Sequence, residues 1–248
     1  MSLSGLSVTW LGHGTFLLQS PGGRRILMDP WLDGNPSCPP EGRAVGAVDL
    51  ILVTHGHFDH VHDAAAVAKK TGATVVGIFE LCQWLEGKGV TKTSGMNKGG
   101  TQELCGIRIT MVDARHSSSY VDGGVITYLG EAAGYVLTFE NGLTVYFAGD
   151  TSLFGDMRLI HELYKPSVAF LPIGDLFTMD PVAAAKACEL LGVKTVIPMH
   201  YGTFPVLVGR PEQLRELVAP LGVEVIEMKP GQTVGLAGNM LSSGSNVA

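Results

Sequence analysis

Short apolar runs alternate along the chain with segments rich in glycine and proline, a pattern of many short strands and helices joined by tight turns. VDLILV at 48–53 is apolar throughout and has the length of a strand buried on both faces. The turn Glu140 to Gly142 predicts a hairpin between its flanking runs. The predicted strands are 6–11, 15–20, 24–29, 48–53, 73–78, 107–114, 133–139, 143–148, 167–173, 194–200 and 223–228.

Helical patterns lie between many of these strands. VHDAAAVAKK at 61–70 is rich in alanine and ends in two lysines, which favour the C-terminal end of a helix dipole. DPVAAAKACELLG at 180–192 begins with Asp180 as N-cap and Pro181 in the first turn. The polar, glycine-bearing segment 115–132 predicts a long loop. Further helices are predicted at 79–87, 157–164 and 210–222.

The order of these elements predicts an α/β fold made of two halves, each a sheet with helices outside. Strands come first, then alternate with helices, and the scheme repeats once. No linker separates the halves, so we expect one domain over 5–237 and a flexible tail at 238–248.

Composition narrows the classes of function. The 248 residues are 46% apolar and 16% charged, enough to bury a full core. The net charge of −6 leaves no large basic face, which disfavours nucleic-acid binding. The four cysteines form no C-x-x-C pair, and we find neither a signal pattern nor an apolar run near the ~18 residues of a membrane helix. These features predict a cytoplasmic protein with reduced thiols and no membrane partner.

The segment VTHGHFDHVHD at 53–63 holds four of the eight histidines, together with two aspartates. His55 and His57 are two residues apart, so an extended turn points both toward one metal ion. A bend into the following helix would bring Asp59 and His60 to a second point nearby. The alternative is that these histidines cap a helix and face solvent, which the density of the cluster disfavours.

One segment cannot complete two metal sites, and the missing ligands are present elsewhere. His116 follows strand 107–114, Asp150 follows strand 143–148, and His200 ends strand 194–200. Ligand sites in sheets flanked by helices collect at the carboxyl ends of strands, so these residues are expected to meet at one edge. Imidazole and carboxylate together suit zinc first, with manganese or iron as alternatives.

H-x-H-x-D-H, followed by a distant histidine, an aspartate in G-D-T and a late histidine, resembles the metallo-β-lactamase superfamily. The resemblance implies an αββα four-layer sandwich, with two mixed β-sheets flanked by helices and a binuclear metal centre. The implied ligands are His55, His57 and His116 for the first metal, Asp59, His60 and His200 for the second, and Asp150 as the bridge.

Further segments give a closer match. WLGHGTFLL, LMDPWLDGNP, GDTSLFGDM, LPIGDLFTM and MHYGTFP resemble a family of metal-dependent hydrolases related to the ascorbate-6-phosphate lactonases. The resemblance covers most of the chain and leaves the substrate open.

The expected function is therefore hydrolysis of a small ester, lactone or phosphodiester by a hydroxide shared between two divalent metal ions. No serine or cysteine stands in a G-x-S-x-G setting, which disfavours covalent catalysis. The alternatives are a nuclease or phosphodiesterase of the same superfamily, a non-catalytic metal-binding regulatory protein and, more weakly, a β-lactamase. The expected partner is a small-molecule substrate, and the chain could form a homo-oligomer.

Asp59, Asp150 and His13 are the side chains expected to take part in the reaction itself. His13, in the turn GHGT, could touch the substrate, donate a proton or serve only the turn. Asp29 either orients a ligand or caps the turn before a proline. Asp63 is expected to cap the helix rather than hold a ligand. Loop 117–131 is a possible lid, and the possible pocket residues are Gly174, Asp175, Thr178, Met179, Tyr201 and Thr203.

Overall fold

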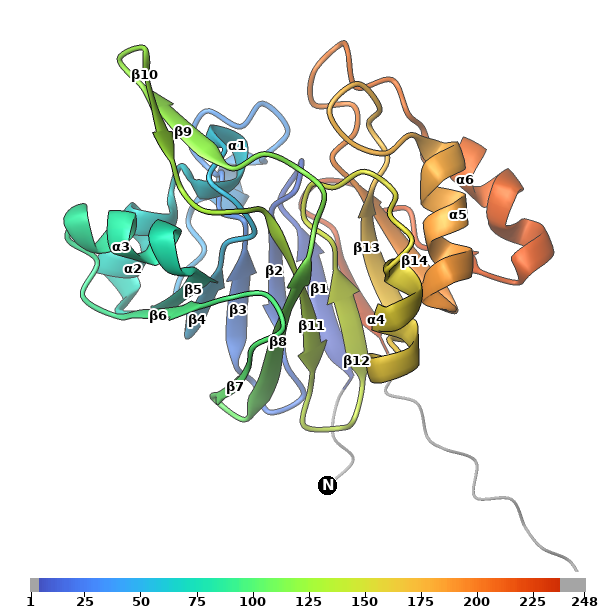
Figure 1. Ribbon diagram of the computed structural model, residues 1–248, viewed down its shortest axis with the longest axis horizontal. Helices are drawn as coiled ribbons and strands as arrows, with labels where there is room; N and C mark the ends of the chain where they lie inside the picture. Colours follow the sequence, from blue (N-terminus) through green and yellow to red (C-terminus); the bar gives the residue numbers. More distant parts are fainter. Residues whose placement is uncertain (1–4, 237–248) are drawn as a thin grey trace, which may run out of the picture.

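The computed structural model describes residues 5–236 and contains two seven-stranded sheets that face each other (Figure 1). The N-terminal sheet has the order β16-β1-β2-β3-β4-β5-β6. It is antiparallel from β16 to β3 and parallel from β3 to β6. Its strands are β1 (Leu6–Trp10), β2 (Phe16–Gln19), β3 (Arg25–Met28), β4 (Leu50–Leu52), β5 (Thr74–Ile78), β6 (Thr93–Met96) and β16 (Thr233–Leu236).

The second sheet has the order β15-β14-β13-β12-β11-β8-β7 and is mixed in the same way. It is parallel from β15 to β12 and antiparallel from β12 to β7. Its strands are β7 (Thr101–Leu104), β8 (Ile107–Asp113), β11 (Ala133–Thr138), β12 (Thr144–Phe147), β13 (Val168–Pro172), β14 (Thr195–Met199) and β15 (Glu224–Val225).

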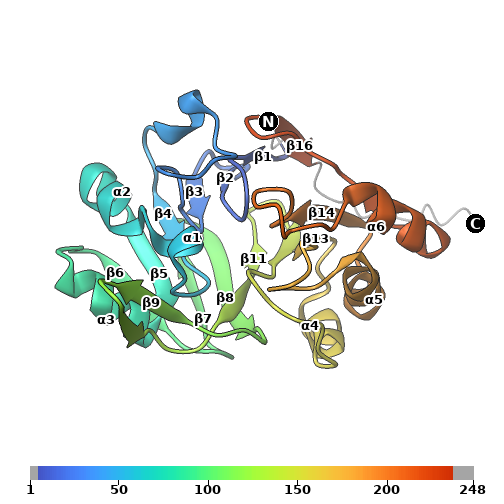
Figure 2. The same cartoon turned by 90° about the horizontal axis from the view of Figure 1, so that it is seen from above.

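Helices cover the outer face of each sheet, which makes four layers (Figures 1 and 2). The helices α1 (Phe58–Val61), α2 (Ala64–Thr71) and α3 (Phe79–Gly87) lie on the side of the N-terminal sheet. The other side carries α4 (Met157–Tyr164), α5 (Pro181–Leu191) and α6 (Pro211–Val218). Short 3-10 turns occupy Pro40–Arg43 and Ala219–Leu221. The predicted αββα sandwich is confirmed.

The main core lies between the two sheets. Phe16 from the N-terminal sheet contacts Phe147 and Phe170 from the second sheet, with ring centroids 6.0 and 5.0 Å apart. A second apolar cluster lies between the second sheet and the helices α4 to α6. Burial of both faces explains why VDLILV and SVAFLPI are continuously apolar.

Several element predictions are confirmed and others are wrong. Asp180 caps α5 by accepting a hydrogen bond from the backbone N–H of Ala183. The strand predicted at 223–228 is only the two residues of β15, and β6, β7 and β16 were not predicted. The helix predicted at 61–70 is divided, because the separate turn α1 precedes α2 and contains Asp59. The tail at 238–248 lies outside the described residues.

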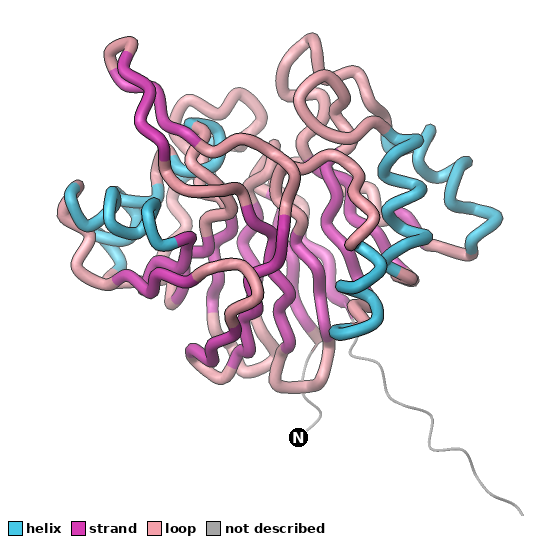
Figure 3. The backbone as a smooth tube through the Cα atoms, in the orientation of Figure 1, coloured by secondary structure: helices cyan, strands magenta, loops and turns pink. Residues whose placement is uncertain are grey.

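The segment 115–132, predicted as a loop, contains a two-stranded hairpin that stands apart from both sheets. Its strands are β9 (Ser119–Asp122) and β10 (Val125–Tyr128), which pair antiparallel around Gly123 and Gly124. Both glycines have positive φ, as a tight hairpin turn requires. Figure 1 shows the hairpin projecting at the upper left, and Figure 3 shows the longer loops gathered along the same edge of the sheets.

None of the helices within residues 5–236 has the length and apolar character needed to span a membrane.

Candidate metal centre

The predicted site residues all follow strands that end at one edge of the two sheets. In both sheets the strands that carry them run in the same direction, so their carboxyl ends meet at the upper edge in Figure 1. The order along the chain is His13 after β1, Asp29 after β3, His55 after β4, His116 after β8, Asp150 after β12 and His200 after β14.

The ring nitrogens of His55, His57 and His116 face one another. His57 Nδ1 lies 3.0 Å from His55 Nε2 and 3.3 Å from His116 Nε2. His55 is fully buried, and its Nδ1 lies 3.0 Å from the hydroxyl of Thr54, which fixes the ring. Three imidazole nitrogens within 4.8 Å of one another could hold one metal ion.

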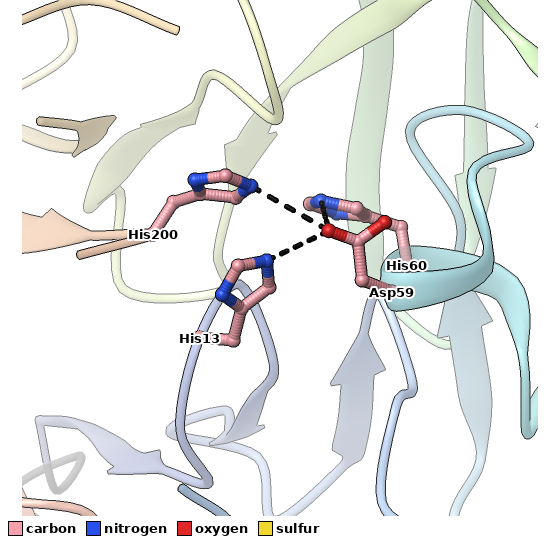
Figure 4. A group of neighbouring side chains, drawn as sticks. All are labelled: His13, Asp59, His60 and His200. Atoms are coloured by element: carbon pink, nitrogen blue, oxygen red, sulfur yellow. Dashed lines mark hydrogen bonds and ion pairs between the residues drawn. The ribbon is translucent and has the colours of Figure 1, made fainter. Parts of the chain in front are cut away.

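A second group contains Asp59, His60 and His200, and it also contains His13 (Figure 4). Asp59 Oδ2 lies 3.9 Å from His60 Nε2 and 3.7 Å from His200 Nε2. His13 Nε2 is closer to the same oxygen, at 2.9 Å. The turn α1 makes this possible, because it aims Asp59 and His60 inward while His57 precedes it. One ligand atom from each of the four residues lies within 4.8 Å of the others, so this group could hold a second ion.

Asp150 lies between the two groups. Its Oδ2 is 3.1 Å from His200 Nε2 and 3.3 Å from His60 Nε2 on one side. On the other side it is 3.6 Å from His116 Nε2 and 3.9 Å from His55 Nε2. One carboxylate thus reaches both groups. The seven residues His55, His57, Asp59, His60, His116, Asp150 and His200 are called the metal cluster below.

Asp29 braces the metal cluster from behind. Its Oδ2 lies 2.8 Å from His60 Nδ1 and accepts a hydrogen bond from the hydroxyl of Thr54 at 2.7 Å. The backbone N–H of Thr54 donates to Oδ1 at 2.7 Å. Three donors around a fully buried carboxylate fix its position, and Asp29 in turn holds His60 with Nε2 toward the cluster. The structure thus favours ligand orientation over a turn cap.

Asp63 has neither of the two roles considered for it. Its side chain makes no cap hydrogen bond to α2 and belongs to neither metal-binding group. Instead Oδ2 accepts hydrogen bonds from the backbone N–H groups of Leu32 and Asp33, at 2.6 and 3.0 Å. Asp63 therefore ties the loop after β3 to the start of α2.

Three residues of this region adopt the left-handed backbone conformation that non-glycine residues seldom occupy. The φ angles are 57° for His13, 44° for Asp29 and 56° for His200. The carbonyl of His13 accepts hydrogen bonds from the indole of Trp10 at 2.9 Å and from the backbone N–H of His200 at 3.2 Å. Such strain persists where surrounding contacts enforce it, and here those contacts join the two sheets.

Burial and nearby charges lower the pKa of some of these imidazoles and raise the pKa of others. Burial lowers the pKa of His55 well below its ordinary value, and nearby His60 adds to that effect. Burial would lower the pKa of His200 too, but the carboxylate of Asp150 raises it to about 9. The pKa of His13 falls to about 4, because burial and His200 outweigh its bond to Asp59. The surroundings of His55 thus favour the neutral imidazole, the form that binds metals. Asp150 favours a positive charge beside it, which protonated His200 supplies when no cation is bound and which a bound metal ion would supply instead.

The donor set fits divalent metal ions. His60 Nε2 and Asp150 Oδ1 are buried and have no hydrogen-bond partner among the described residues, which is costly for polar atoms in a protein interior. Both atoms belong to side chains that face the metal cluster. Two carboxylates and five imidazoles in one place match the ligands of zinc, manganese and iron sites.

A pocket of about 390 Å³ opens over the metal cluster. Its floor includes His57, Asp59, His116, Asp150 and His200. Its walls include three aromatic residues that could not be predicted from the sequence, since nothing in their spacing marks them. The wall residues are Phe58, Ser117, Ser119, Val121, Phe177 and Phe204.

Other predicted pocket residues lie elsewhere. His13 is fully buried behind Asp59 and does not line the pocket. Thr203 lies behind His13, with its hydroxyl 3.0 Å from Nδ1. Tyr201 stacks on Trp10 at 5.4 Å instead of facing the pocket. Gly174, Asp175, Thr178 and Met179 are absent from the pocket lining, although Phe177 beside them is part of it.

Comparisons with known proteins identify the family of the chain. The family model described as a Beta-lactamase superfamily domain matches residues 24–201. A UPF0173 metal-dependent hydrolase of Koribacter versatilis is 54% identical over 233 residues, covering 94% of this chain and 99% of the relative. A UPF0173 metal-dependent hydrolase of Solibacter usitatus is also 54% identical, over 229 residues, covering 92% of this chain and 99% of that protein.

A solved structure shows the same architecture. Igni18, a metallo hydrolase from the archaeon Ignicoccus hospitalis, is 36% identical and superposes with a TM-score of 0.84, covering 94% of this chain and 99% of its own. These findings confirm the resemblance found in the motifs. The chain belongs to the UPF0173 family of metal-dependent hydrolases, within the metallo-β-lactamase superfamily.

Proposed function

We propose that this hydrolase acts on a small ester, lactone or phosphodiester with the help of two divalent metal ions. The observation that carries the proposal is the position of Asp150, whose one oxygen lies within 3.9 Å of a nitrogen from each of four histidines in two groups. A carboxylate so placed can be shared by two cations. When bound, the two cations would activate a water molecule and polarise the bond to be cleaved.

The ligand roles in this proposal follow the two groups. His55, His57 and His116 would hold one ion, Asp59, His60 and His200 would hold the other, and the carboxylate of Asp150 is placed to serve both. Zinc is the first choice, with manganese or iron as alternatives, because all three accept imidazole and carboxylate ligands.

The remaining roles follow from position. Asp59 and Asp150 line the pocket, so their carboxylates can accept a hydrogen bond from the attacking water and set its direction. His13 and Asp29 lie behind the cluster, so we assign them to positioning Asp59 and His60 and not to contact with the substrate.

Metal analysis of the purified protein, together with a hydrolase screen on lactones, thioesters and phosphodiesters, tests the proposal. We expect about two equivalents of metal, and we expect Asp150→Ala to lose metal and at least 10³-fold in kcat/KM while keeping its fold by circular dichroism. Asp156→Ala, at an exposed aspartate whose side chain makes no cap hydrogen bond to α4, serves as control and should match the parent protein. Full activity of Asp150→Ala, or a metal-saturated parent inactive on every substrate, would refute the proposal.

A further inference from the structure

We propose that the substrate carries an uncharged apolar acyl or aryl group, which binds between the β9–β10 hairpin and the aromatic wall formed by Phe58, Phe177 and Phe204. This inference rests on the proposed function, because it places the cleaved bond over the metal cluster. It deepens that function by selecting a substrate class among esters, lactones and phosphodiesters.

The aromatic wall leaves apolar surface open to solvent beside the reaction centre. Phe58 is 50% exposed and Phe177 is 58% exposed, although both line the pocket. Phe58 and Phe204 pack against buried Trp31, with ring centroids 5.5 and 5.8 Å away, so these two rings are held in place. Exposed apolar surface gathered at one place marks a binding site, and here it faces the metal cluster.

The hairpin extends the same apolar surface away from the cluster. Ser119 and Val121 line the pocket from one face of β9, because alternate residues of a strand share a face. Their partners across the hairpin are Tyr128 and Ile126, which therefore lie on that face too. Val121 is 59% exposed and Ile126 is 73% exposed. An apolar chain leaving the cluster would meet this face next.

The opposite face of the hairpin packs against the body of the protein. Tyr120 points away from the pocket and packs against Trp84 of α3, with ring centroids 5.0 Å apart. Lys88 lies over both rings, 4.4 Å from the centroid of Trp84. The hairpin is thus attached to the body of the protein through one face, which leaves its pocket face free to contact a ligand.

Charge excludes a phosphorylated or polyanionic substrate group in this pocket. Among the residues that the structure describes, none of those lining the pocket is a lysine or an arginine. Lys98 and Arg115, which lie close to His116, both pair with Asp113. An anionic group away from the metal ions would lie beside phenylalanines, with no side chain to offset the loss of its hydration.

A series of p-nitrophenyl acetate, butyrate and octanoate, hydrolysed by the metal-loaded full-length protein, tests this inference. We expect KM to fall about two- to threefold per added methylene over the first few, since each methylene leaves water for an apolar wall. Bis(p-nitrophenyl) phosphate should be a poorer substrate than the octanoate ester by at least 100-fold in kcat/KM. Equal KM values along the series, or preference for the phosphodiester, would overturn the inference.

Matched variants on the two faces of the hairpin locate the effect. Val121→Ser should raise KM for the octanoate ester about fivefold, a clearly larger factor than for the acetate ester. Val125→Ser is the control, because Val125 is similarly exposed but shares the face of Tyr120. Equal effects of the two variants, or no effect of either, would remove the hairpin from the binding site.

A binding measurement separates failure of this inference from failure of the proposed function. Calorimetry with acetate, octanoate and inorganic phosphate needs no turnover. Octanoate binding at least tenfold more tightly than acetate, and more tightly than phosphate, supports the apolar pocket even if no ester is cleaved. Hydrolysis of esters without that preference would leave the proposed function standing and reject the apolar substrate class.

Discussion

The metal cluster and the β9–β10 hairpin form two sides of one pocket, but they are held in different ways. Side chains of the cluster come from both sheets and are braced by further buried groups, as Asp29 braces His60 at 2.8 Å. The hairpin belongs to neither sheet and rests on α3 through Tyr120 and Trp84. Substitutions of the buried residues that support the metal cluster should therefore lower the free energy of unfolding and the metal content. Substitutions at the hairpin should instead alter substrate preference.

The largest expected effect comes from Asp29→Asn. Asparagine keeps the shape and tolerates the left-handed backbone, but its amide has one accepting oxygen. It can no longer accept both from the backbone N–H of Thr54, at the place of Oδ1, and from His60, at the place of Oδ2. With the amide nitrogen toward His60, the buried ring of His60 loses its hydrogen-bond acceptor. Its Nε2 is then no longer kept directed toward the metal cluster. We expect a loss of about 3 kcal/mol in the free energy of unfolding and a 10- to 100-fold weaker affinity for one metal equivalent, measured by urea denaturation and metal competition.

Asp63→Asn is the matched control, since Asp63 accepts only backbone hydrogen bonds that an asparagine oxygen can still accept. It should cost less than ~1 kcal/mol and keep both metal equivalents. If Asp29→Asn bound metal as tightly as the parent, the bracing role of Asp29 would be wrong.

His13→Asn should have an intermediate effect. The amide of asparagine can occupy the place of Nδ1 beside Thr203, while the Nε2 that lies 2.9 Å from Asp59 is lost. Asp59 is then free to turn, so we expect a 10- to 100-fold weaker affinity for the ion held by Asp59, with the other ion unaffected. Titration of the metal-free variant with zinc should show one tight and one weakened equivalent.

The control for this variant is His161→Asn on α4. The Nδ1 atom of His161 lies 2.8 Å from the carbonyl oxygen of Leu191, and His161 is not part of the pocket lining. It should change stability alone. Loss of both equivalents in His13→Asn, or of none, would contradict the assignment of His13 to Asp59.

The metal cluster and the hairpin also differ in how well their positions could be predicted from the sequence. Residues of the metal cluster are chemically distinctive and follow strands, so the order of the elements suffices to predict His55, His116 and His200 at one edge. The structure brings them together, and their assignment as ligands stays a prediction. The position of His13 behind Asp59 had no such signal, because it depends on a left-handed backbone that contacts between the sheets enforce.

The hairpin was predicted as a loop although its local pattern favours strands. Tyr120, Val121, Ile126 and Thr127 are strand-forming residues on either side of the turn Asp122 to Gly124, which is a hairpin signal. The serines and glycines of the wider segment 115–132 led to the prediction of a loop instead. Phe58, Phe177 and Phe204 come from three separate loops or turns and meet only in the folded chain. The aromatic wall thus depends on contacts that no local pattern encodes.

The smallest effect is expected from Trp84→Ala, which tests whether the hairpin is held independently of the metal cluster. Trp84 is half-buried and supports Tyr120, so its removal should cost about 1 kcal/mol in the free energy of unfolding. Within residues 5–236, no hydrogen bond, ion pair or ring contact joins this pair to the metal cluster, so metal content should stay at the parental value. Hydrogen exchange should rise at the amides of β9 and β10 alone, and KM should rise for the octanoate ester but not for the acetate ester. Trp84→Phe should restore both. A fall in metal content would show instead that the hairpin and the metal cluster are held as one unit.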